Sequence, residues 1–138
     1  MKKTIFSSAA MAGAFVAASL FSTGSALAAC TLTEWTNILP GHPLPQVTGR
    51  VCDGDMAVNV IGADPSGATF DFGWSAMEQI GTDSFTAEFV DANATNKVQM
   101  DVNPLLNTMR MTIDTTILAT SQNTIWYADY VLTKVYDQ

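Results

Sequence analysis

Apolar and polar side chains alternate along most of this chain after its second cysteine, and this alternation is the feature that most limits its fold. Successive side chains of a strand point to opposite faces, so a two-residue period predicts strands with one buried face and one solvated face. The segments with this pattern are 56–61, 68–74, 85–89, 98–102, 109–113 and 125–135. Turns rich in glycine, proline, asparagine or aspartate separate several of them. No stretch after residue 28 has a sustained helical period, and we therefore predict an all-β domain.

Six or seven short strands at regular intervals are typical of a two-sheet antiparallel sandwich of the jelly-roll kind. The last segment, 125–135, is bulky on both faces, with Trp126 and Tyr130 on one side and Tyr127 and Val131 on the other. A strand of this kind is expected at the centre of its sheet or beneath a second layer.

The first 28 residues have the pattern of an export signal. Two lysines precede an apolar stretch centred on 11–21, and Ala26-Leu27-Ala28 supplies the small residues that a signal peptidase requires. The apolar stretch is too short and too rich in alanine for a membrane-spanning helix, which needs about 20 apolar residues. We therefore predict a signal peptide over 1–28, a single secreted or periplasmic domain over 29–138, and no transmembrane segment in that domain.

Cys30 and Cys52 are the only cysteines, and two interpretations compete for them. In an oxidising compartment an isolated pair favours a disulfide, which would close a loop of roughly twenty residues and stabilise the fold by about 3 kcal/mol. Leu27-Ala28-Ala29-Cys30 also resembles a bacterial lipobox, in which Cys30 would carry a lipid anchor. A lipidated Cys30 could not pair with Cys52, so the two interpretations exclude each other, and we favour the disulfide.

Charge and ligand chemistry exclude several classes of partner. The formal net charge is −7, and losing the two lysines of the leader would make it more negative, which argues against nucleic-acid binding. Two cysteines and the single His42 match no usual zinc spacing, and Asp53-Gly54-Asp55 falls well short of a calcium loop. We therefore expect no metal and no cofactor.

Catalytic patterns are equally sparse. His42 lies between glycine and proline in a loop, and no Gly-x-Ser-x-Gly elbow accompanies it. The only glutamates are Glu34, Glu78 and Glu88, and they form no clustered pair of the kind that glycosidases use. The sequence therefore predicts a protein that is not an enzyme.

Aromatic side chains are the remaining candidates for a binding site. Trp and Tyr rings form flat apolar platforms in sugar-binding sandwiches, and here Trp35, Trp126 and Tyr127 are the candidate binding residues. Trp74 has the same parity as Phe70 and Phe72 in its segment, so we expect these residues to share a face in the core.

The layout resembles small secreted bacterial proteins of the concanavalin-like or carbohydrate-binding-module type. The resemblance rests on Cys30-x-x-x-x-Trp35, on Gly49-x-x-Cys52 followed by the segment 56–61, on the aromatic segment 85–89, and on Trp126-Tyr127-Ala128-Asp129-Tyr130-Val131-Leu132 near the end. It implies a two-sheet fold and, less directly, sugar binding, because a fold alone does not fix a function.

These observations together predict an exported, non-catalytic binding or interaction module, with a glycan or another surface as the candidate partner. Two alternatives stay open at this point. One is a surface-associated structural protein or a lipoprotein anchored through Cys30, and the other is a hydrolase whose site has no recognisable motif.

Overall fold

The computed structural model describes residues 29–138, and the predicted signal peptide at 1–28 lies outside them. Every helix or strand in the described part is a β-strand, as the alternation predicts. The strands are β1 (Cys30–Asn37), β2 (Gln46–Cys52), β3 (Asp55–Ala63), β4 (Thr69–Ala76), β5 (Glu78–Gly81), β6 (Ser84–Val90), β7 (Ala94–Asn103), β8 (Thr108–Ile117) and β9 (Gln122–Asp137). Between residues 29 and 138 there is no helix long and apolar enough to cross a membrane.

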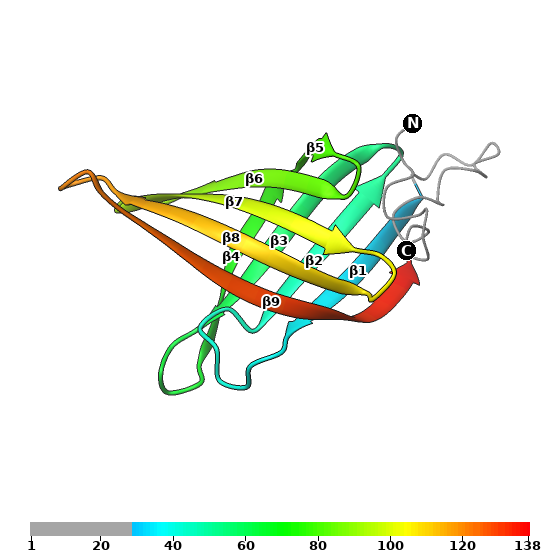
Figure 1. Ribbon diagram of the computed structural model, residues 1–138, viewed down its shortest axis with the longest axis horizontal. Helices are drawn as coiled ribbons and strands as arrows, with labels where there is room; N and C mark the ends of the chain where they lie inside the picture. The colour runs from blue at the N-terminus through cyan, green and yellow to red at the C-terminus, as the bar shows by residue number, and fades with distance from the viewer. Residues whose placement is uncertain (1–28) are drawn as a thin grey trace.

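The described strands form one antiparallel sheet that curls into a half-barrel (Figure 1). Their order is β4-β3-β2-β1-β9-β8-β7-β6-β5, so only the β1–β9 neighbours are distant in sequence. The edge strands β4 and β5 are separated by Met77 alone, and the two edges of the sheet therefore approach each other at this residue. Beyond Met77 the seam of the half-barrel runs between β4 and β6, where the Ser75 hydroxyl donates to the Glu88 carbonyl at 2.7 Å.

The predicted all-β antiparallel class is confirmed, but the two separate sheets of a sandwich are not. One sheet rolls over so that its two halves face each other across the core (Figure 1). A rolled sheet and a sandwich both give each strand one inner face and one outer face, so a two-residue period cannot distinguish them.

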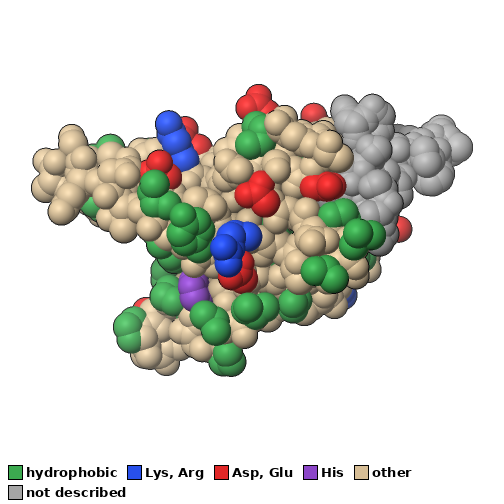
Figure 2. All heavy atoms as spheres, viewed as in Figure 1, with side chains coloured by type: hydrophobic (Ala, Val, Ile, Leu, Met, Phe, Trp, Pro, Cys, Tyr) green, Lys and Arg blue, Asp and Glu red, His purple; other side chains and the backbone are tan. Residues whose placement is uncertain are grey.

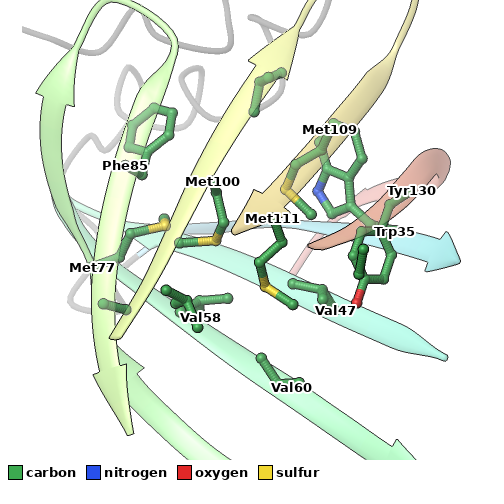
Figure 3. Close-up of a cluster of buried hydrophobic side chains, with 14 of the residues drawn as sticks. Trp35, Val47, Val58, Val60, Met77, Phe85, Met100, Met109, Met111 and Tyr130 are labelled. Carbon is green, nitrogen blue, oxygen red and sulfur yellow. The ribbon is translucent and has the colours of Figure 1, made fainter. Parts of the chain in front are cut away.

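The core fills the space between the two halves of the sheet (Figure 3). Trp35 of β1, Phe85 of β6, Met111 of β8 and Tyr130 of β9 are each no more than 1% exposed. The Tyr130 hydroxyl donates to the Leu44 carbonyl at 3.0 Å, which attaches the loop between β1 and β2 to the core. Burial raises the pKa of Tyr130, so its hydroxyl stays protonated and remains a donor.

Strand β9 lies at the centre of the sheet, as its two bulky faces predict. Tyr130 points into the core, whereas Ile125, Tyr127 and Val131 are exposed on the outer face. The predicted division of its side chains between two faces is therefore confirmed. The outer face of β9 is open within residues 29–138, so of the two expected arrangements the strand has the central position and not the covering layer.

The prediction that Trp74 shares a core face with Phe70 and Phe72 is wrong. Gly73 has a φ of +85°, and the β3–β4 register shifts between Asn59 and Ile61, so a bulge reverses the alternation. Phe70 pairs with Gly62 on the inner face, whereas Trp74 pairs with Asn59 on the outer face. All three residues are 40–49% exposed. Phe70 and Phe72 are exposed because they lie at the open end of the half-barrel, and Trp74 because it lies on the outer face.

Gly73→Ala tests this bulge. A Cβ at Gly73 would meet no atom within 4 Å, so the cost comes from the positive φ alone and is expected to be about 1–2 kcal/mol. Gly81→Ala is the matched control, since Gly81 has no such φ and its Cβ would make an ordinary 3.4 Å contact with Ser84. Urea unfolding of both variants measures the difference, and equal stability of the two would contradict the bulge.

Cys30 and Cys52 are joined by a disulfide, with their sulfur atoms 2.05 Å apart. The two residues are register partners at the paired ends of β1 and β2, with Cα atoms separated by 4.1 Å. The bond therefore ties the start of the described chain to the body of the sheet. Because it uses the sulfur that a lipid would occupy, this arrangement agrees with the disulfide interpretation of the sequence.

Candidate functional site

A polar surface with one exposed aromatic ring covers the outer face of β7, β8 and β9. The strand register places its six side chains in two rows across the strands. One row is Gln99, Thr112 and Tyr127, and the other is Asp101, Arg110 and Asp129. We call these six residues the outer platform. Figure 2 shows this face, on which basic and acidic side chains lie close together at the centre.

Tyr127 is the aromatic centre of the outer platform. Its side chain is 57% exposed, although β9 is paired on both sides along the sheet. The Arg110 guanidinium carbon lies 5.6 Å from the centre of its ring. A rigid central strand therefore presents the ring, with a cation beside it.

An ion pair fixes the second row of the platform. Arg110 donates from Nε and Nη2 to the two carboxylate oxygens of Asp129, at 2.7 and 2.8 Å. This pairing raises the pKa of Arg110 and lowers the pKa of Asp129, so both stay charged at neutral pH. Gln99 adds an amide that donates to Asp101 at 3.2 Å. The platform thus combines a flat apolar ring with oriented donors and acceptors.

The structure places the three candidate aromatic residues in three different environments. Trp35 is 1% exposed, and its indole N–H donates to the Thr33 hydroxyl at 3.1 Å inside the core. Trp126 and Tyr127 are neighbours on β9 and therefore lie on opposite faces of the sheet. Trp126 is half-buried on the inner face, where it stacks with His42 at 6.1 Å between ring centres. Of the three candidates, only Tyr127 lies on the outer face with its ring largely exposed.

The sequence pattern predicts neither the ion pair of the outer platform nor the outward position of Trp74 on the other half of the sheet. Arg110 and Asp129 are 19 positions apart and meet only because β8 and β9 pair in this register. The alternation predicts Trp74 in the core, but its ring lies under Arg50 on the outer face, with 4.2 Å from the guanidinium carbon to the ring centre. Gly73 between Phe72 and Trp74 was the one sequence signal for the bulge that turns Trp74 outward.

Trp74 is a second outward aromatic ring, but the polar groups near it hydrogen-bond mainly to one another. Near Trp74, the Asn59 amide donates to Asp71 at 2.6 Å, and Asp71 also accepts from the backbone N–H of Gly73 at 2.7 Å. These hydrogen bonds, with that from Gly73 the stronger cause, lower the pKa of Asp71. Because both bonds serve to hold the bulge, this group is the weaker candidate for a ligand site.

Metal-binding side chains do not cluster in the described part of the chain. No group of three or more His, Cys, Asp or Glu side chains in residues 29–138 could hold an ion. His42 Nδ1 accepts the backbone N–H of Leu44 at 3.0 Å, so the single histidine helps to order its own loop.

The comparisons with known proteins give no relative. No protein-family model matches the chain, and neither a curated protein nor a solved structure is significantly similar to it.

Proposed function

We propose that this protein is an exported, non-catalytic binding module that takes a glycan on the outer platform. The observation that carries the proposal is the exposed ring of Tyr127 on the central strand, with Arg110, Asp129 and Gln99 arranged around it. This is the combination that sugar recognition uses, because a sugar has apolar C–H faces and a rim of hydroxyl groups.

The contacts of the platform suit such a ligand. The apolar face of a sugar ring would lie on Tyr127, while its hydroxyl groups would donate to Asp129 and accept from Gln99 or Arg110. The two hydrogen bonds between Arg110 and Asp129 already orient both side chains, so binding would cost little conformational entropy in ordering them.

Export is supported by two features of the chain. The leader at 1–28 has the pattern of a signal peptide, and disulfides such as Cys30–Cys52 form and persist in oxidising compartments. A secreted or periplasmic module would meet glycans of cell surfaces or of the surrounding medium.

The alternative of a surface-associated interaction protein has one observation in its favour. Ile125 and Val131 are 54% and 37% exposed on the same outer face of β9 as Tyr127. Aromatic and aliphatic side chains exposed together are also common where one protein contacts another.

A glycan array probed with the wild type and with Tyr127→Ala tests the proposal. We expect the wild type to bind a set of glycans, and the variant to bind them at least about tenfold more weakly, since aromatic stacking contributes about 1.5 kcal/mol. Trp74→Ala is the matched control, because it removes another exposed ring with an arginine over it from the other half of the sheet. Absence of any glycan binding, or equal binding by Tyr127→Ala, would refute the proposal.

A further inference from the structure

A small cavity opens on the inner face of the half-barrel, lined in part by residues of β4 and β6. These two strands diverge toward this end of the sheet (Figure 1). Its volume is about 40 Å³. Phe72 of β4, Phe89 of β6 and Trp126 of β9 form part of its wall, and Leu44 and Ile113 form another part. The cavity is independent of the outer platform, because Trp126 and Tyr127 face opposite sides of the sheet.

The walls of this cavity are apolar. Asn96 is the single polar residue among those that line it, and its side-chain oxygen accepts the Thr115 hydroxyl at 2.7 Å. None of the lining residues carries a charge. A ligand group that enters the cavity must therefore be apolar, since a buried polar group without a partner is costly.

An aromatic rim extends the cavity toward solvent. Phe70 and Phe72 are 49% and 40% exposed, with their ring centres 5.2 Å apart. Phe72 reaches Phe89 across the seam at 6.2 Å. Phe70 packs against Gly62, where a Cβ would lie 2.5 Å from two atoms of its ring. These rings form an exposed apolar surface beside the cavity, which we call the aromatic rim.

The volume limits what the cavity can hold. A group the size of a water molecule needs about 10–15 Å³ of cavity volume. The 40 Å³ of this cavity therefore accommodates about three such groups. An apolar cavity of about 150 Å³ is the size that accepts a benzene molecule, so neither an aromatic ring nor a sugar fits inside here. About three carbons at the end of an unbranched chain do fit, and the following carbons would lie on the aromatic rim.

Charge limits the other end of the ligand. The chain carries a formal net charge of −7, which repels an anionic head group such as a carboxylate. We propose that the open end of the half-barrel binds the terminal carbons of an unbranched alkyl chain that carries a neutral head group.

A series of primary alcohols from 1-butanol to 1-octanol tests the proposal, with tryptophan fluorescence and titration calorimetry as readouts. We expect saturable binding that strengthens by about fourfold for each added methylene while the cavity and rim are being filled. Cyclooctanol, which has the same number of carbons as 1-octanol in a wide ring, is expected to bind at least tenfold more weakly, and octanoate more weakly than 1-octanol.

Phe72→Ser and Trp74→Ser are matched variants for the same titration. The two side chains lie on opposite faces of one strand. Because they are 40% and 44% exposed, their replacement by serine should change the stability of the protein by similar amounts. We expect Phe72→Ser to weaken 1-octanol binding about tenfold and Trp74→Ser to leave it unchanged. The proposal is overturned if 1-octanol shows no saturable binding, if cyclooctanol or benzyl alcohol binds as tightly, or if the two variants behave alike.

Discussion

Trp35→Ala is expected to lower the free energy of unfolding by about 4 kcal/mol. The side chain is 1% exposed and packs against the buried cluster between the two halves of the sheet, so its removal leaves a large cavity. The Thr33 hydroxyl also loses its indole donor inside the core. Chemical denaturation in urea, fitted to a two-state transition, measures the change.

Trp74→Ala is the control for this loss. Trp74 is 44% exposed on the outer face, where Arg50 lies over its ring, so we expect a change below about 1 kcal/mol. If both tryptophan variants lost stability equally, the division of the rings between core and surface would be incorrect.

The double variant Cys30→Ser, Cys52→Ser is expected to lose about 3 kcal/mol of stability. The two cysteines are separated by 22 positions, and closing a loop of this length restricts the unfolded chain by about that amount. Neither residue belongs to the buried core, so serine adds little further cost. The measurement is urea unfolding of the double variant beside the oxidised wild type.

Reduction of the wild-type protein provides the control for these substitutions. Unfolding in the presence of a thiol reductant should give the same loss as the double variant, because both remove the same cross-link. A loss below about 1 kcal/mol in both experiments would show that the bond does not restrict the unfolded chain as expected.

Much of the fold could be predicted from local pattern alone. The alternation around Tyr130 and Tyr127 separates the inner and outer faces of β9 correctly, because consecutive side chains of a regular strand must point in opposite directions. The joining of all nine described strands into one rolled sheet could not be predicted from this local pattern. It depends on β1 pairing with β9, which are almost the full length of the domain apart.

The predictions for Trp74 and Trp35 differ from the structure for local physical reasons. One glycine with a positive φ, Gly73, reverses the parity of β4 and moves Trp74 from the expected core to the surface. Trp35 was a candidate binding residue because its ring is large and lies near a loop in the sequence. The structure instead uses this ring to fill the core, where its indole N–H has a hydroxyl partner.

The candidate site could be predicted only in part for a related reason. Tyr127 can be identified in the sequence as an aromatic residue in a segment that clearly predicts a strand. The side chains that surround it in the outer platform come largely from β7 and β8. Pairing of Arg110 with Asp129 requires the exact register of two strands, which residue composition does not determine.

The exposed position of Trp74 after the Gly73 bulge is central to this account, because the alternation of the sequence predicts a buried ring at this residue. Tryptophan emission and acrylamide quenching of Trp74→Phe, compared with the wild type, test it directly. Trp74 is the most exposed of the three tryptophans, so its removal should shift the emission to shorter wavelengths and reduce quenching. A shift to longer wavelengths with stronger quenching would show that Trp74 is buried, and would contradict the account.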